Sequence, residues 1–95
     1  MAKKNNPSNK IPDFLTVKVL SANQVIFDGQ AWSVASSNKL GPFSIIPGHA
    51  GFIALLDDTL EINKHEHGRD KIEIPIKKAV LHCQDNSVRV LVGSV

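Results

Sequence analysis

The sequence predicts an all-β protein, a small β-sandwich or flattened barrel of about 8–10 short antiparallel strands. Apolar and polar residues alternate with a period of two along most of the chain after Phe14, which is typical of half-buried strands. Turn-forming residues interrupt these runs every roughly 8–12 residues, the spacing expected of an all-β domain. With 95 residues, of which 42% are hydrophobic, the chain can form one small core.

The first residues differ from the rest in composition. Residues 1–12 carry three lysines, no acid and two prolines, so they cannot bury enough apolar area to become ordered. Removing these three lysines from the 11 basic residues leaves 8 against 9 acidic ones. We therefore expect a flexible basic tail over residues 1–13 and one nearly neutral domain over 14–95, which argues against a nucleic-acid partner.

The first half of the chain contains three short strands. We expect them at 15–19, 25–27 and 32–35, with turns or loops at 21–24, 28–29 and 36–39. Each strand carries alternating or continuous apolar residues, and each connection is rich in Ser, Asn, Asp or Gly.

The second half begins with a hairpin. Residues 60–62 and 72–76 alternate, and a polar tip at 63–70 joins them. Pro75 donates no hydrogen bond, so its strand is expected at a sheet edge or beside a bulge. Strands at 79–83 and 88–92 follow, with a turn at Asp85–Asn86. Residues 50–56 are the one segment that could be helical, but it is too short for periodicity to decide.

The sequence offers no catalytic constellation. No phosphate-binding glycine loop is present. His82 and Cys83 are neighbours in the sequence, but on a strand they should face opposite ways, so they do not form a pair of base and nucleophile. His65 and His67 could bind zinc together, but no third ligand has a recognisable spacing. We therefore predict no catalytic residue, cofactor or metal, and we keep a histidine-based metal or ligand module as an alternative.

The segment from Leu40 to Phe52 alternates turn formers with large apolar residues. Pro47–Gly48 suits the centre of a type II turn, where glycine supplies a positive φ. Phe43, Ile45 and Ile46 cannot all face one core. Physics alone leaves two interpretations open, a core strand with a tight turn and a docking surface.

This segment resembles the G-x-x-G-I-x-P-G-H-A signature of the epsilon subunit of rotary F-type ATP synthases. The resemblance extends from about Leu15 to Val92 and includes 19–24 and 27–29, the strand at 31–36 and the final strand at 86–91. It implies the N-terminal β-sandwich of a non-catalytic central-stalk subunit, which packs on the gamma subunit and the c-ring and couples ion-driven rotation to ATP synthesis or hydrolysis. It also implies a peripheral location on the cytoplasmic face of a membrane, a bacterial inner or plasma membrane, and no small-molecule substrate.

The resemblance also transfers residue roles. Gamma contacts are expected at Ser21, His49, Ala54 and Lys77, c-ring contacts at Leu40, Gly41, Pro42 and Phe43, and the signature turn at Pro47, Gly48 and Ala50. The apolar anchors of such an interface would be Phe43, Ile46 and Phe52.

The sequence departs from the family pattern at several positions. Pro42 stands where the ring-facing loop usually carries an acid, and Lys77–Lys78 replaces small residues at a gamma-facing edge, so the partner would need acids there. The C-terminal helical hairpin of most family members is missing from these 95 residues. A free-standing β-sandwich that has left the complex and binds a metal or another partner is the alternative function.

Overall fold

The computed structural model describes residues 14–48, 51–65 and 70–94. Within them the chain forms strands only, and no helix is long and apolar enough to cross a membrane. The strands are β1 (Leu15–Leu20), β2 (Val25–Ala31), β3 (Ser33–Asn38), β4 (Gly41–Ile45), β5 (Phe52–Leu56), β6 (Leu60–Asn63), β7 (Lys71–Ile74), β8 (Lys78–Gln84) and β9 (Ser87–Ser94).

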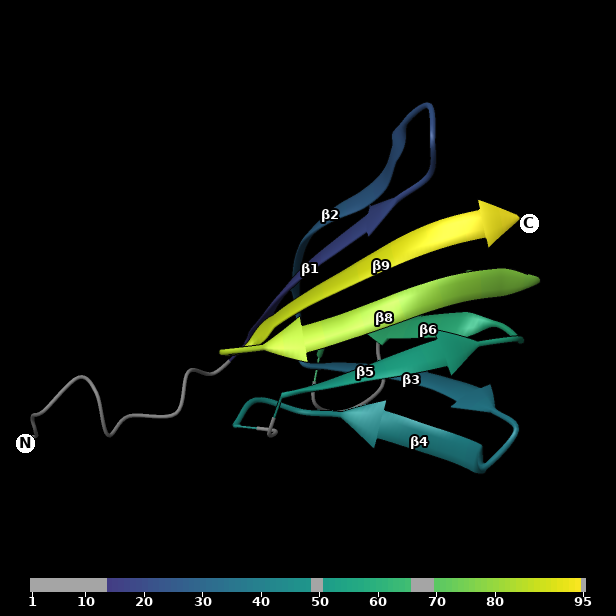
Figure 1. Ribbon diagram of the computed structural model, residues 1–95. Helices are drawn as coiled ribbons and strands as arrows, with labels where there is room; N and C mark the ends of the chain where they lie inside the picture. Colours follow the sequence, from purple (N-terminus) through teal and green to yellow (C-terminus); the bar gives the residue numbers. More distant parts are fainter. Residues whose placement is uncertain (1–13, 49–50, 66–69, 95) are drawn as a thin grey trace, which may run out of the picture.

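Two sheets form the two layers of a β-sandwich (Figure 1). The five-stranded sheet has the order β2-β1-β9-β8-β5, and the four-stranded sheet has the order β4-β3-β6-β7. The predicted fold class is confirmed. One detail differs from the expectation of purely antiparallel strands, because β1 pairs with β9 in parallel. The first and last strands thus lie side by side in the middle of one sheet.

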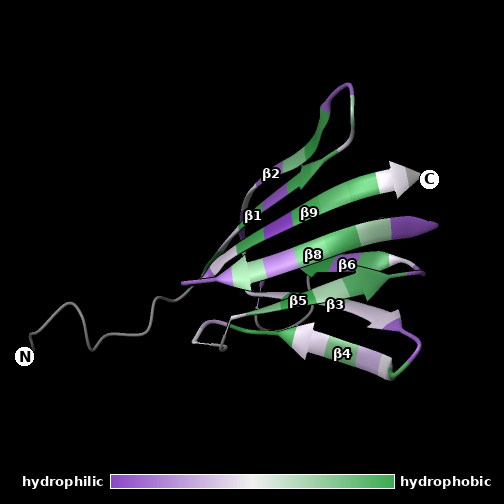
Figure 2. Ribbon diagram, viewed as in Figure 1, coloured by the Kyte–Doolittle hydropathy of each residue, from purple (hydrophilic) through white to green (hydrophobic). Residues whose placement is uncertain are grey.

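The core lies between the sheets and follows the predicted alternation. Along β8 and β9 every second residue is buried, and Figure 2 shows hydrophobic residues along much of both strands. The largest fully buried side chains come from both layers: Leu15, Ile45, Leu56, Leu60, Ile62 and Leu81. Apolar burial of this kind supplies roughly 25 cal/mol per Å² and is the main stabilising contribution in a domain of this size.

Several predicted boundaries in the first half are wrong. Asp28–Gly29 is not a turn, because β2 continues through it to Ala31 and Gly29 pairs with Val17. Residues 36–38 are not a loop, because they extend β3 and pair with β4, and Ser36 is buried. In both cases pairing with a neighbouring strand overrides the local preference of polar and small residues for turns.

The second half agrees better with its prediction. β6 and β7 form the expected hairpin, and Pro75 directly follows β7, the edge strand of its sheet. The segment that could have been helical contains β5, because residues 52–56 pair with β8. Residues 66–69 of the predicted polar tip, like the tail at 1–13, lie outside the described residues.

The turn between β8 and β9 joins three parts of the fold. Asp85 and Asn86 have φ of 53° and 63°, as a two-residue hairpin of type I′ requires. The side-chain oxygen of Asn86 accepts a hydrogen bond from the Gly48 amide at 2.7 Å, and its carbonyl accepts one from the Thr16 amide at 2.9 Å. Asn86 therefore links this hairpin both to β1 and to the Pro47–Gly48 turn.

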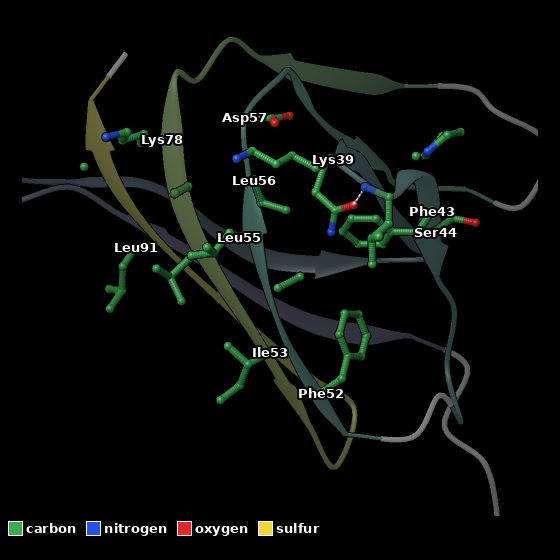
Figure 3. A pocket seen from close by; sticks show the side chains of 18 residues that line it. Lys39, Phe43, Ser44, Phe52, Ile53, Leu55, Leu56, Asp57, Lys78 and Leu91 are labelled. Atoms are coloured by element: carbon green, nitrogen blue, oxygen red, sulfur yellow. Dashed lines mark hydrogen bonds between the residues drawn. The ribbon is translucent and has the colours of Figure 1, made fainter.

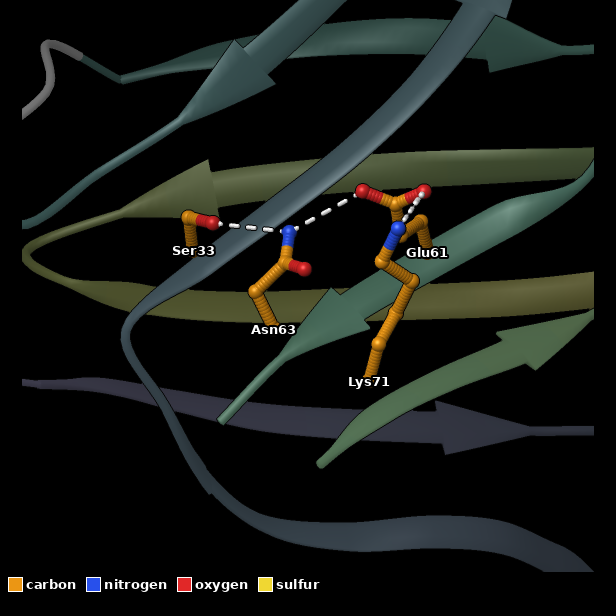
Figure 4. A network of polar contacts seen from close by, with 4 residues as sticks. All are labelled: Ser33, Glu61, Asn63 and Lys71. Atoms are coloured by element: carbon orange, nitrogen blue, oxygen red, sulfur yellow. Dashed lines mark hydrogen bonds and ion pairs between the residues drawn. The ribbon is translucent and has the colours of Figure 1, made fainter. Parts of the chain in front are cut away.

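A polar network lies across the four-stranded sheet where β3, β6 and β7 meet (Figure 4). The Asn63 amide donates to the buried Ser33 hydroxyl at 3.0 Å and to Glu61 at 3.2 Å, and Lys71 contacts Glu61 at 3.6 Å. Because the Ser33 hydroxyl is bonded, its burial carries no uncompensated desolvation cost. This network therefore connects the first residue of β3, the last residue of β6 and the first residue of β7.

Candidate docking surface

A groove opens along the side of the sandwich where β4 and β5 lie at the edges of their sheets. It has a volume of about 980 Å³ and is lined mainly by β4, β5 and the turn before β4, with contributions from β8 and β9. Figure 3 shows Phe43, Phe52 and Leu56 on one side of β5, and Ile53, Leu55 and Leu91 on the other. We call this feature the open-side groove.

Two aromatic rings form the inner wall of the open-side groove. The rings of Phe43 on β4 and Phe52 on β5 are 5.9 Å apart and nearly perpendicular, an edge-to-face contact. Such a pair contributes about 0.5–1.5 kcal/mol beyond its buried area. Both side chains are half-buried against the core. They therefore close the interior of the sandwich and also offer an apolar wall to a ligand outside it.

The rim of the groove exposes large apolar side chains. Leu40, at the turn between β3 and β4, is 97% exposed, and Ile53 and Leu55 on β5 are 69% and 70% exposed. The Leu40 amide donates to the Asn38 side chain at 2.8 Å, and Gly41 has a φ of 119°, so the turn holds Leu40 outward. Exposed apolar residues gathered in this way indicate an interaction site rather than a catalytic pocket.

The predicted c-ring contacts lie together on this groove. Leu40, Gly41, Pro42 and Phe43 all line it, and so does Ala54, one of the predicted gamma contacts. Lys77 is exposed just before β8, next to the groove-lining Lys78. Ser21 follows β1, which β9 and β8 separate from β5, and its amide bonds to the Gln24 carbonyl at 2.9 Å. The structure thus gathers most of the predicted contacts at one side and leaves Ser21 apart.

The signature turn is partly described. Gly48 has a φ of 90°, as the predicted type II turn at Pro47–Gly48 requires. Ile46, one of the predicted anchors, is 48% exposed, whereas Ile45 belongs to the core. His49 and Ala50 lie outside the described residues, so their expected roles stay predictions.

The histidines form no metal site in the described part of the chain. No group of three potential metal ligands occurs there. His65 lies 3.0 Å from Asp70, and both side chains are exposed. His67 lies outside the described residues. His82 is exposed and Cys83 is buried on opposite faces of β8, as predicted, so they cannot act together as base and nucleophile.

Cys83 is the one thiol of the sequence and faces the core. Its side chain is buried between the sheets, and burial raises the pKa of the Cys83 thiol above its usual value. Desolvation disfavours the thiolate, which is the nucleophilic form. Cys83 is therefore a core residue without catalytic character.

We expect this raised pKa to make the domain less stable in alkali. A thiol with a higher pKa in the folded state stabilises the fold below the unfolded pKa, and this contribution is lost as the pH rises through the folded pKa. The free energy of unfolding, measured in urea, should fall more steeply above about pH 8.5 for the wild type than for Cys83→Ala. Parallel pH profiles of the two proteins would contradict the prediction.

Sequence reasoning missed four exposed apolar residues, Ile53, Leu55, Val80 and Leu91. The sequence did contain a signal for these residues, because a strand with one face exposed to solvent should be polar at every second position. In β9 Leu91 lies between two buried valines, and β5 is apolar at all five positions. Apolar residues at the alternate strand positions that should face solvent were therefore the sequence signal of a docking surface.

The fold and this surface define a class of protein: a small β-sandwich that presents an apolar docking surface. Comparisons with known proteins then narrow the class. The family described as ATP synthase, delta/epsilon chain, beta-sandwich domain matches residues 14–95. The chain therefore belongs to this family.

Curated relatives carry the name ATP synthase epsilon chain. The relative from Synechococcus sp. (strain RCC307) is 30% identical over 80 residues, which is 84% of this chain and 58% of the relative. The relative from Leptospira borgpetersenii serovar Hardjo-bovis is 31% identical over 78 residues, 81% of this chain and 59% of the relative. The chain thus spans somewhat more than half the length of these relatives.

Solved structures agree on the fold. A chain of the Euglena gracilis mitochondrial ATP synthase, solved by cryo-EM as OSCP/F1/c-ring, matches with a TM-score of 0.78 at 17% identity. The match covers 97% of this chain and 58% of the Euglena chain. A chain of the Tetrahymena thermophila mitochondrial ATP synthase central stalk and c-ring has a TM-score of 0.68 at 13% identity, covering 90% and 67%. At these identities the likeness concerns the fold alone.

Proposed function

We propose that this chain is a non-catalytic subunit of the central stalk of an F-type ATP synthase. In this role it packs on the gamma subunit and the c-ring and helps to couple ion-driven rotation to ATP synthesis or hydrolysis. The observation that carries the proposal is the family match over residues 14–95, which spans both sheets of the sandwich. The subunit would be peripheral to the membrane, on its cytoplasmic face, and would need no cofactor.

The open-side groove supports a docking role of this kind. An interface needs a desolvated apolar centre and a polar rim. Phe43, Phe52 and Ala54 supply the apolar centre. The exposed Lys78 lines the groove, and the exposed Lys77 precedes it in the chain. In the proposed complex the gamma subunit contacts Ala54, Lys77, Ser21 and His49, and the c-ring contacts the turn at 40–43.

The test is binding to the gamma subunit of the same organism. We expect the purified chain to bind gamma one-to-one with a submicromolar dissociation constant, measured by calorimetry. Lys77→Glu should weaken this binding about tenfold, because it replaces a cation at the rim that faces acidic groups of gamma. No binding by a folded chain would contradict the proposal.

The matched control is Lys71→Glu. Lys71 is also exposed, but it lies on β7, the far edge of the other sheet. Because the substitution removes the Lys71–Glu61 contact, urea denaturation first establishes that this variant is folded at the binding temperature. The net charge changes equally in both variants, so long-range electrostatics is held constant. Gamma affinity should be unchanged in this control. Equal weakening by the two substitutions would mean that net charge, and not a contact at Lys77, determines the affinity.

A further inference from the structure

The solvent-facing side of the five-stranded sheet carries an uninterrupted row of apolar residues. Leu55 pairs with Val80, Val80 with Leu91, Leu91 with Leu20, and Leu20 with Val25. These five residues cross all five strands of the sheet, and four of them are between 39% and 70% exposed. We call them the apolar row. Its three members on β5, β8 and β9 also line the outer margin of the open-side groove.

Basic side chains border the apolar row on both sides. On one side, a row of basic residues lies two positions from the apolar row on the same strands. These residues are direct cross-strand neighbours: Lys18, Arg89 and His82. On the other side Lys78 precedes Val80 by two residues on β8, and it is exposed.

Acidic groups balance this charge only in part. Lys18 has a partner in Asp28 at 4.0 Å, and the exposed Asp57 follows β5. Within the described residues, neither Arg89 nor Lys78 forms an ion pair. Like charges directly opposite each other in a sheet destabilise it, so a partner that supplies acids at these margins would be attracted.

We propose that the apolar row binds an amphipathic α-helix with acidic margins, supplied by another polypeptide and lying across the strands. Adjacent strands are about 4.8 Å apart and successive helical turns about 5.4 Å apart, so one apolar side chain per turn of such a helix meets one strand. Five strands span about 19 Å, the length of a helix of about 13 residues. Glutamates or aspartates beside the helical stripe then face Arg89 and Lys78.

Other occupants fit the face less well. A sheet needs a broad apolar face, but this one is a single row. About 6.8 Å away it is bordered on one side by His82, Arg89 and Lys18, with the apolar Ile53 at the end of that border, and on the other side by Lys78. A helix about 10–12 Å wide fits between these basic side chains. A planar membrane would meet the long side chains of Arg89 and Lys78 before the row. A second copy of the chain, face to face, would bring basic margins against basic margins. The inference goes beyond the rotor proposal, because it depends on the sheet face and not on membership of a complex.

The test uses a designed helical peptide of about 13 residues with one leucine per turn and glutamates on both sides of the leucine stripe. We expect micromolar binding by fluorescence anisotropy, with amide NMR shifts at Val80 and Leu91. A peptide with lysines in place of the glutamates should bind at least about tenfold more weakly. Equal binding of the two peptides would contradict the proposal that the bound helix has acidic margins. Shifts confined to Phe43 and Phe52 would contradict the proposal that the helix binds at the apolar row.

Two variants on β8 test the row from the side of the protein. Val80 and Gln84 are both exposed on the same face, four residues apart. Val80→Glu places a carboxylate in the apolar row and should weaken binding of the acidic peptide at least about tenfold, whereas Gln84→Glu should leave it within about twofold. Equal weakening by both would overturn the proposal. So would tighter binding of the unmodified chain to phosphatidylserine vesicles than to the peptide, or self-association of the chain through this face.

Because neither experiment includes gamma, its outcome is separate from that of the rotor proposal. A chain that binds gamma but not the acidic peptide would retain the rotor function and lose this inference. A chain that binds the peptide through Val80 but not gamma would do the reverse.

Discussion

Leu81→Ala is expected to lower the free energy of unfolding by about 2–5 kcal/mol, which is the usual cost of deleting a buried leucine side chain. Leu81 has no exposed surface and lies on β8, where it pairs with Ala54 on β5 and Val90 on β9. The cavity would open between the two sheets, where neighbours on paired strands cannot move in to fill it. Urea denaturation at neutral pH measures the loss directly.

The same substitution in the apolar row provides the control. Leu55→Ala removes the same atoms from a neighbouring strand, but Leu55 is 70% exposed. Its effect on the free energy of unfolding should stay within about 0.5 kcal/mol. Thermal melts should separate the two variants by about 6 °C or more, because 1 kcal/mol shifts the midpoint of a domain of this size by about 4–8 °C. Equal losses would mean that Leu55 is packed as tightly as the core.

The sequence predicts the core of this fold well because burial leaves a period of two. Along β8 and β9 the alternation identifies Leu81, Cys83 and Val88 as core residues, and they are buried. It fails at Asp28–Gly29 and at Ser36, where turn-forming residues continue a strand. There the residues pair with a neighbouring strand, as Gly29 does with Val17 on β1 and Ser36 with Phe43 on β4. Local propensity cannot reveal such a partner.

The candidate site could be predicted only in part for a related reason. The resemblance to a known family identifies the turn at Leu40 and the position of Ala54, and the structure gathers both at the open-side groove. The apolar row depends on register, because Val80 and Leu91 become neighbours only when β8 and β9 pair as they do. A shift of one residue would exchange the inward and outward residues of a strand. Single exposed apolar residues therefore acquire meaning only once the pairing is known.

Asn86→Ala should lower the free energy of unfolding by about 1.5–3.5 kcal/mol, although Asn86 lies in a turn. Two contributions add up. An alanine held at the φ of 63° seen here costs about 1–2 kcal/mol, and loss of the acceptor for the Gly48 amide at 2.7 Å costs about 0.5–1.5 kcal/mol.

Two further substitutions separate these contributions. Asn86→Gly accepts the positive φ but lacks the acceptor, so only the hydrogen-bond cost remains, partly raised by the greater entropy of the unfolded chain. Asn86→Asp keeps an acceptor and tolerates the left-handed conformation. Stability in urea should therefore fall in the order wild type and aspartate, then glycine, then alanine. A glycine variant as unstable as the alanine variant would show that backbone conformation contributes nothing at Asn86, and the hydrogen bond that ties the β8–β9 hairpin to the signature turn would then account for the whole effect.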